Sequence, residues 1–355
     1  MNDKSWVYGW LEPGLGKGLV TCSGQKAKSR RRLLAPCFHP DVLRKYLTVF
    51  IENSEKLVNA LKEEENNEFT CIENFISLCT IDIIFETMFG TKIDALKNRS
   101  SIFKTSLERA EDIFFSRLYK PWLWPSFIFW NTKYGKELKQ CMNVLEDITK
   151  KGHETVATSA SWALYLIGLH PDVQAKIHEE IDEVFGDEMK RPLTEIDLKN
   201  LHFLDSVLKE TARLYPAIPL IARQATEDCN ICDYVIPKGA TCVIFLYFLN
   251  RDEDVFPEPN KFDPDRFLPE NSVNIPEYGY IPFSAGARSC IGYKYAEMEL
   301  KTIMCSILRN FTVTSLDDRE KIQPMLKIAL HPSQPIRLKF RTRSIQKRTQ
   351  NLELI

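Results

Sequence analysis

The stretch that decides the fold is FSAGARSCIG, residues 283–292. It follows an irregular, Pro-rich segment and leads into a helical pattern, so Cys290 is expected at the N-terminus of a helix. Backbone N–H groups and the helix dipole at such an end favour a thiolate, the form of cysteine that binds a metal. Gly286 permits a tight turn, Gly292 allows a flat group to approach closely, and Arg288 can pair with a carboxylate of that group.

The composition is that of an ordinary globular protein. The 355 residues suit one large domain or two smaller ones, and 44% of them are apolar. The 47 Lys and Arg balance the 48 Asp and Glu, so small or apolar partners are expected and nucleic acid is not. The ten cysteines lack framework spacing and indicate reduced thiols facing the cytosol. No apolar run approaches the roughly 20 residues of a spanning helix.

The order of helical and loop signals predicts a mainly α protein with small β-sheets. Gly is sparse at 14 residues, and the 19 Pro are concentrated in the second half, so long helices should precede the loops. Gly90, Pro171 and Gly186 mark helix ends, and Thr194 opens a capping box. Apolar periodicity predicts two helices within residues 41–90 and further helices over 135–170, 172–186, 194–214 and 292–308.

Other segments permit more than one interpretation. The strand patterns Tyr234–Ile236 and Thr241–Phe248 flank a Pro-Lys-Gly turn and should pair as a hairpin. Residues 121–130, PWLWPSFIFW, form either a loop packed on the core or a patch that dips into a membrane surface. The CxxC at 229–232 has no second pair and is not expected to bind zinc. The basic run from Arg341 indicates a solvated tail over residues 341–355.

The cysteine segment matches, at each fixed position, the haem-binding loop FxxGxRxCxG of the cytochromes P450. This resemblance implies that Cys290 is the axial ligand of a haem iron. The implied cofactors are haem b (iron protoporphyrin IX), dioxygen, and electrons from NADPH delivered by NADPH-cytochrome P450 reductase. The loop residues that would bind the haem beside Cys290 are Phe283, Gly286, Arg288 and Gly292.

Two further segments resemble the family's structural lock beneath that loop. The run Glu210-Thr-Ala-Arg213 is similar to the family's ExxR motif, in which a carboxylate and a guanidinium share one helix face. The run Pro264-Asp-Arg-Phe267 resembles the segment whose arginine, here Arg266, completes a Glu–Arg–Arg cluster. The resemblance implies a buried network of structural rather than catalytic importance.

The segment Gly152-His-Glu-Thr155 is similar to the family's oxygen-activating motif, on the helix that crosses the haem. In that setting Gly152 leaves room for dioxygen, the Thr155 hydroxyl can hydrogen-bond it, and the Glu154 carboxylate can relay protons from water. The alternative is an ordinary Glu-Thr pair on a solvent-facing side of a helix.

The haem propionates also have candidate partners. Arg31 and Arg223 match arginines that bind propionates in the family. Ala27 stands where the family has a tryptophan, so haem binding should be weaker unless Arg30 or Arg32 compensates. The alternative for this basic run is a solvated helix face.

The motif at residues 152–155 is followed by the sequence of residues 161–164, which resembles the family-four branch of fatty-acid ω-hydroxylases. Residues 80–84 with 86–87, and residues 169–174, resemble the same branch. This resemblance implies a small apolar substrate, peripheral membrane contact and a location at the endoplasmic reticulum membrane. We expect residues 1–340 to form one cytochrome P450 domain that lacks two blocks: the family's amino-terminal anchor with its first sheet, and several tens of residues before Gly152. We expect residues 141–151 to extend the distal helix across that junction.

Three functional hypotheses remain open at this stage. The first is a haem-thiolate monooxygenase that inserts one oxygen atom of dioxygen into an apolar substrate, such as a fatty-acid terminus. The second is a truncated haem-binding paralogue, or incomplete gene model, with little activity. The third is a helical binding protein without haem. The spectrum of the reduced, CO-treated protein separates the third hypothesis from the others.

Overall fold

The computed structural model describes residues 3–12, 16–98, 102–146 and 153–343. The 3-10 helices are η1 (Trp6–Leu11), η2 (Ala35–Phe38), η3 (Pro121–Leu123), η4 (Pro264–Phe267) and η5 (Gly286–Arg288). The α-helices are α2 (Gly24–Leu34), α3 (Pro40–Glu63), α4 (Ile72–Phe89), α5 (Ala95–Asn98), α6 (Ile102–Tyr119), α7 (Ser126–Asn131), α8 (Lys133–Glu146), α9 (His153–Leu169), α10 (Pro171–Phe185), α11 (Glu195–Asn200), α12 (His202–Leu214), α13 (Leu246–Leu249), α14 (Pro269–Ser272) and α15 (Tyr293–Asn310). Helices therefore make up most of the fold.

The strands form small antiparallel sheets. Two sheets have three strands each, in the orders β1-β3-β6 and β2-β10-β7, and β4 pairs with β5 as β8 does with β9. The strands are β1 (Asp3–Lys4), β2 (Thr70–Cys71), β3 (Leu220–Gln224), β4 (Cys229–Ile231), β5 (Tyr234–Ile236), β6 (Thr241–Phe245), β7 (Phe311–Ser315), β8 (Pro324–Leu326), β9 (Leu330–Pro332) and β10 (Arg337–Thr342). The prediction of a mainly α fold with small β-sheets is confirmed.

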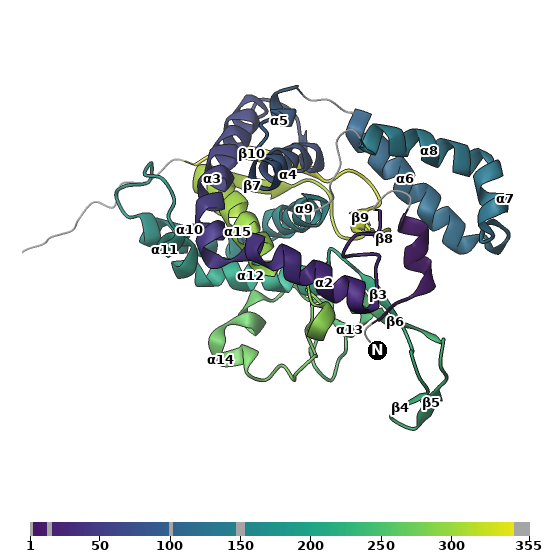
Figure 1. Cartoon of the computed structure of the whole chain (residues 1–355). Coiled ribbons are helices and arrows are strands. Elements are labelled where there is room, and N and C mark those ends of the chain that lie inside the picture. The colour runs from purple at the N-terminus through teal and green to yellow at the C-terminus, as the bar shows by residue number, and fades with distance from the viewer. Residues whose placement is uncertain (1–2, 13–15, 99–101, 147–152, 344–355) are drawn as a thin grey trace, which may run out of the picture.

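Helix α9 forms the centre of the core (Figure 1). Between residues 156 and 167 every side chain except Ser159 is buried, as expected for a helix that is apolar on all sides. The helix packs against α4, α12, α15 and β7. The Trp162 ring stacks on the Tyr215 ring, with centroids 4.0 Å apart, and its indole N–H donates to the Leu330 carbonyl at 2.7 Å. The core thereby links α9 to the β8–β9 hairpin.

Several helix ends lie where the sequence predicts them. Helix α4 ends at Gly90, which adopts a left-handed conformation with φ 67°. The Thr194 hydroxyl accepts the Asp197 N–H while the Asp197 carboxylate accepts the Thr194 N–H, so the capping box forms as predicted. Helix α10 ends at the residue before Gly186. The local signals for these ends are therefore sufficient.

The prediction of one helix over 194–214 is wrong, because the chain leaves the helical conformation at Leu201, with ψ 75°. Helices α11 and α12 lie on either side of that break. The N–H groups of Phe203 and Leu204, in the first turn of α12, donate to the Glu180 carboxylate of α10 at 2.6 and 2.9 Å. A side chain distant in sequence caps the second helix and so stabilises the break.

The predicted hairpin between 234–236 and 241–248 is also wrong. Strand β5 pairs with β4, and β6 pairs with β3. Residues 246–249 form α13 rather than an extension of the strand. Cys232 occupies the β4–β5 turn with φ 51°, so the CxxC segment supplies a strand and a turn. The β4–β5 hairpin projects from the molecule (Figure 1).

Two other expectations fall partly outside the described residues. Helices α8 and α9 cover the predicted helix of 135–170, and residues 147–152 between them, with Gly152, lie outside the described ranges. The predicted extension of the distal helix across this junction stays a prediction. Of the predicted basic tail, Arg341 and Thr342 belong to β10, and Arg343 pairs with Asp182 at 2.9 Å. Residues 344–355 lie outside the described ranges.

Candidate functional site

The cysteine loop is closed by its own backbone. The Cys290 N–H donates to the Phe283 carbonyl at 2.8 Å, and the Ser289 N–H donates to the Gly286 carbonyl at 3.0 Å. Gly286 has φ 66°, which supplies the tight turn that the sequence requires there. The rings of Phe283 and Tyr293 meet edge to face at 4.6 Å. The loop therefore presents Cys290 from a defined turn that leads directly into α15.

The environment of Cys290 corrects one expectation. Cys290 is exposed to a hollow of about 420 Å³ that Phe283 and Tyr293 also line. The protein around the sulfur desolvates it and raises the pKa of the thiol, against the opposite effects of the Gly292 N–H and Arg31. The sequence predicts that the helix terminus favours the thiolate. In the structure, desolvation of the sulfur outweighs that effect. A cation bound to the sulfur would supply the missing stabilisation.

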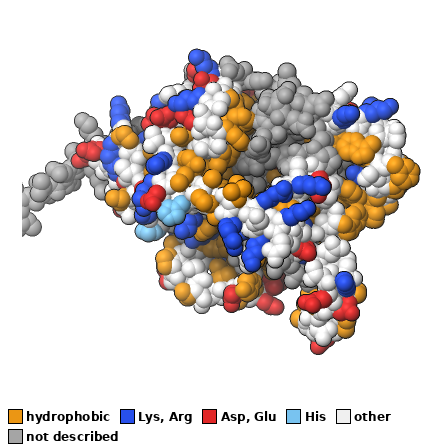
Figure 2. Space-filling model, viewed as in Figure 1, with side chains coloured by type: hydrophobic (Ala, Val, Ile, Leu, Met, Phe, Trp, Pro, Cys, Tyr) orange, Lys and Arg blue, Asp and Glu red, His pale blue; other side chains and the backbone are white. Residues whose placement is uncertain are grey.

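Three arginines from separate elements lie around the loop. Arg31 of α2 donates to the Ser289 carbonyl at 2.5 Å, and Arg223 of β3 donates to the Ser284 hydroxyl at 3.3 Å. Arg288 of the loop donates to the Cys22 carbonyl at 2.7 Å. Among the described residues, no carboxylate lies within ion-pair distance of these three guanidinium groups. Figure 2 shows Lys and Arg side chains gathered over α2.

This group of cations carries a surplus of positive charge. Burial and the nearby charges of Arg223 and Arg288 lower the pKa of Lys4 to about 7. Burial and the charge of Arg223 also lower the pKa of Arg288. One nitrogen of Arg30, Nη1, is buried without a hydrogen-bond partner in the described structure. Uncompensated cations from several elements fit a ligand with two carboxylates, such as the two propionates of haem.

Two helical features lie beside this arrangement. Ala27 is the buried residue of α2, 3% exposed, at the position where the resemblance expects a tryptophan. Gly292 faces the Phe38 ring, and a Cβ there would lie 3.4 Å from it. The neighbour that approaches Gly292 in this structure is thus the Phe38 ring. The residues present fit a haem: one thiol for the iron and several cations for the propionates.

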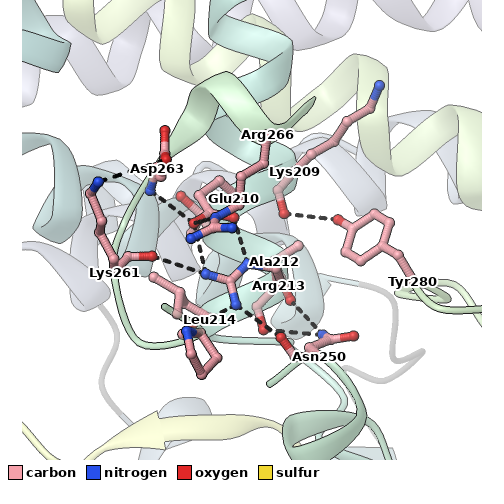
Figure 3. Close-up of polar contacts among 12 residues, drawn as sticks. Lys209, Glu210, Ala212, Arg213, Leu214, Asn250, Lys261, Asp263, Arg266 and Tyr280 are labelled. Carbon is pink, nitrogen blue, oxygen red and sulfur yellow. Dashed lines mark hydrogen bonds and ion pairs between the residues drawn. The ribbon is translucent and has the colours of Figure 1, made fainter. Parts of the chain in front are cut away.

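The structure brings Glu210, Arg213 and Arg266 together (Figure 3). Both Glu210 and Arg213 are completely buried, and Arg213 Nε and Nη2 donate to the two Glu210 oxygens at 2.6 and 2.8 Å. Arg266 Nε lies 3.7 Å from Glu210 Oε1, which also accepts the Asp263 N–H at 2.9 Å.

Arg213 also binds the end of α13 and the Pro-rich coil, residues 256–282, that precedes the cysteine loop. It donates to the backbone carbonyls of Asn250, Pro259 and Lys261 at 2.7–3.0 Å (Figure 3). The coil therefore has fixed anchor points although it lacks long regular elements. The Tyr280 hydroxyl donates to the Lys209 carbonyl at 2.9 Å, which ties the approach to the cysteine loop to the same helix, α12.

The candidate distal residues lie at the start of α9. Glu154 and Thr155 are in its first turn and are both partly buried. The Glu154 carboxylate lies 3.3 Å from His331 Nε2, on strand β9. Sequence reasoning misses His331, because a single histidine in a weak strand pattern carries no signal of its long-range contact. Gly152, the third residue of the predicted motif, is outside the described ranges.

Comparisons with known proteins identify the family to which the chain belongs. The chain matches the family model for cytochrome P450 in two stretches, residues 1–151 and 147–340, and it belongs to the cytochrome P450 family. It is 37% identical to Cytochrome P450 4V2 of Mus musculus, with 96% of this chain and 77% of that protein covered. It is 37% identical to the Homo sapiens protein of the same name, with 98% of this chain and 78% of that protein covered. It is 32% identical to Cytochrome P450 4c3 of Drosophila melanogaster, with 96% of this chain and 76% of that protein covered.

The alignment with the mouse protein runs over 404 positions, although this chain has 355 residues, so positions of that relative lack a counterpart here. The two matched stretches of the family model meet at residues 147–151. The absence of a block before Gly152 stays a prediction. Family membership makes the protein a haem-thiolate monooxygenase, which uses haem iron, dioxygen and electrons from a redox partner.

Proposed function

We propose that this protein hydroxylates the terminal carbon of a fatty acid or a similarly apolar chain, in a single domain that spans residues 1–340. The proposed prosthetic group is haem b, and the proposed electron source is NADPH through NADPH-cytochrome P450 reductase. The observation that carries the proposal is the cysteine loop, which presents Cys290 from a defined turn and has Arg31, Arg223 and Arg288 around it without carboxylate partners among the described residues. The similarity to family-four proteins supports the substrate class.

The chain's own residues have separate roles in this proposal. The Cys290 sulfur would hold the iron, with Phe283, Gly286 and Gly292 shaping the loop around it. Arg31, Arg223 and Arg288 would hold the two propionates. When bound, the haem iron supplies the chemistry of dioxygen activation.

The distal residues manage protons and orientation. The Glu154 carboxylate would accept a proton from solvent and release it toward the reacting oxygen, and the Thr155 hydroxyl would orient that oxygen by a hydrogen bond. Gly152 would leave the space for dioxygen beside the helix. Glu210, Arg213 and Arg266 would keep the cysteine loop in place without contacting the reacting atoms.

Spectroscopy and turnover together test the function. The haem-reconstituted protein, reduced and treated with CO, should show the red-shifted Soret band of a thiolate-ligated haem. With the reductase and NADPH, medium- and long-chain fatty acids should yield ω-hydroxylated products. A thiolate band without any product would show a haem-binding protein that lacks the proposed activity. Failure to bind haem would overturn the assignment of the site.

An exposed aromatic patch supports the proposed contact with the endoplasmic reticulum membrane. Its residues are Trp6, Trp122, Trp124, Phe127, Ile128 and Trp130, all of them exposed. The Trp6 and Trp124 rings meet at 5.3 Å, which joins η1 to the segment of η3 and α7. Figure 2 shows hydrophobic side chains over the region of α7 and α8. No helix in the described part of the chain is long and apolar enough to span a bilayer.

Replacing two residues of this patch should weaken membrane binding. Trp122 is 65% exposed and Phe127 is 74% exposed. Each large side chain contributes roughly 1.5–3 kcal/mol when it leaves water. The double variant Trp122→Ser/Phe127→Ser should therefore bind phosphatidylcholine vesicles at least about tenfold more weakly in a flotation or sedimentation assay.

A matched control uses an equally exposed aromatic residue elsewhere. Tyr234 on the β4–β5 hairpin is 74% exposed and lies outside the aromatic patch. The variant Tyr234→Ser should bind vesicles as the unchanged protein does. Equal vesicle binding by the patch variant and the unchanged protein would contradict the proposed membrane contact.

A further inference from the structure

One contact at the start of α9 joins residues that are far apart in the sequence. Glu154 Oε1 lies 3.3 Å from His331 Nε2, and both side chains are about one-fifth exposed, at 18% and 22%. A carboxylate and an imidazole at this separation attract each other strongly when the imidazole is protonated. The contact is therefore sensitive to the proton on the histidine.

The β8–β9 hairpin is held in the place that makes this contact. The Leu330 carbonyl accepts the Trp162 indole N–H at 2.7 Å, and the Leu330 N–H donates to the Ala217 carbonyl at 3.0 Å. In the turn of the hairpin, directly after β8, Lys327 Nζ lies 2.9 Å from the Asp112 carboxylate of α6. His331, next to Leu330, is thus presented to α9 by a strand that is anchored at the turn end of the hairpin.

The charges around the pair also favour it. Glu154 lies in the first turn of α9, where the helix dipole stabilises a negative charge. Two other charged groups lie close to the β8–β9 hairpin, and they pair with each other: Lys327 in its turn and Asp112 of α6. Glu154 is then the carboxylate that α9 presents to the His331 imidazole.

We propose that His331 is a positioning residue for Glu154, holding its carboxylate against the β8–β9 hairpin and exchanging a proton with it. In this exchange the proton on His331 Nε2 passes to Glu154 Oε1, and the imidazole regains a proton from water. The inference rests on the proposed function, because it assigns Glu154 its proton source. A purely structural contact would hold the hairpin against α9 without affecting the delivery of protons to Glu154.

Histidine NMR of the ferrous, CO-bound holoenzyme tests the contact directly. The chain has six histidines, and the resonance absent from His331→Asn identifies the residue. In Glu154→Gln, the titration midpoint of His331 should move to lower pH, because the carboxylate that stabilises the imidazolium has lost its charge. The resonances of His39, His170, His178 and His202, which are not adjacent to Glu154 in the sequence, should keep their midpoints.

The control is Asp112→Asn, which disrupts the ion pair of Asp112 with Lys327 of the same hairpin. It should leave the His331 midpoint unchanged. A shift of equal size in Asp112→Asn and Glu154→Gln would show a general disturbance of the hairpin. That result, or an unchanged midpoint in Glu154→Gln, would overturn the proposal.

The pH profile of turnover distinguishes a positioning role from a structural one. The variant His331→Asn should keep the thiolate-haem spectrum, but the fraction of NADPH electrons recovered in product should fall by about tenfold. In the unchanged protein, turnover should change with pH around the titration midpoint of His331. In His331→Asn, this change should disappear. An unchanged profile would overturn the positioning role. If the unchanged protein shows no turnover, the proposed function fails, while the NMR titration still decides whether His331 and Glu154 are coupled.

Discussion

The variant Cys290→Ser should lose the red-shifted Soret band of the reduced, CO-treated protein. A serine hydroxyl stays protonated at neutral pH, so the loop would no longer offer an anionic sulfur to the iron. NADPH-dependent hydroxylation should fall by about 10³-fold or more, since an indispensable member of the catalytic unit is removed. The CO difference spectrum and product analysis measure the two effects on the same preparation.

The substitution is small, so the fold should survive it. The backbone bond from Cys290 N–H to the Phe283 carbonyl does not involve the side chain. The matched control is Cys232→Ser, an exposed cysteine in the β4–β5 turn, which should keep both the band and the turnover. A thiolate-type band that persists in Cys290→Ser would show that another residue binds the iron.

The second large effect is expected from Arg213→Ala, which should lower the free energy of unfolding by about 3–5 kcal/mol. The substitution leaves the completely buried Glu210 carboxylate without the guanidinium that donates to both of its oxygens. It also removes the donor to the backbone carbonyls of Asn250 at the end of α13 and of Pro259 and Lys261 in the Pro-rich coil. Urea denaturation followed by circular dichroism measures the change.

Helix α12 offers its own control for this measurement. Lys209 Nζ lies 2.8 Å from Asp205 Oδ2, and the two side chains are 42% and 34% exposed. Exposed pairs of this kind contribute roughly 0–1 kcal/mol, so Lys209→Ala should have little effect. Similar losses in Lys209→Ala and Arg213→Ala would contradict the structural role of the buried network.

The network also shows how far a local motif predicts a tertiary contact. The i, i+3 spacing of Glu210 and Arg213 places both side chains on one helix face, which is a property of any helix. Spacing alone does not bury the pair, and exposed pairs with similar spacing occur elsewhere in this chain, as at Arg44 and Asp41. Burial of Glu210 and Arg213 comes from the coil and η4, which pack over α12.

Two errors of prediction have the same physical origin. Residues 194–214 have continuous apolar periodicity, yet Glu180 of α10 caps a second helix after Leu201. A Pro-Lys-Gly turn follows β5, yet β5 pairs with β4 and leaves β6 to β3. In each case a partner outside the local window decides the outcome, and a local pattern cannot identify it.

The sequence by itself determined the helical class, many helix ends, the cysteine loop and the spacing of the Glu–Arg pair, because these features depend on neighbouring residues. Only the tertiary structure decided the environment of the Cys290 sulfur, where desolvation outweighs the Gly292 N–H. It also decided the meeting of Arg31, Arg223 and Arg288 and the contact of Glu154 with His331. Solvation and charge depend on every group that packing brings near, whatever the distance between those groups in the sequence.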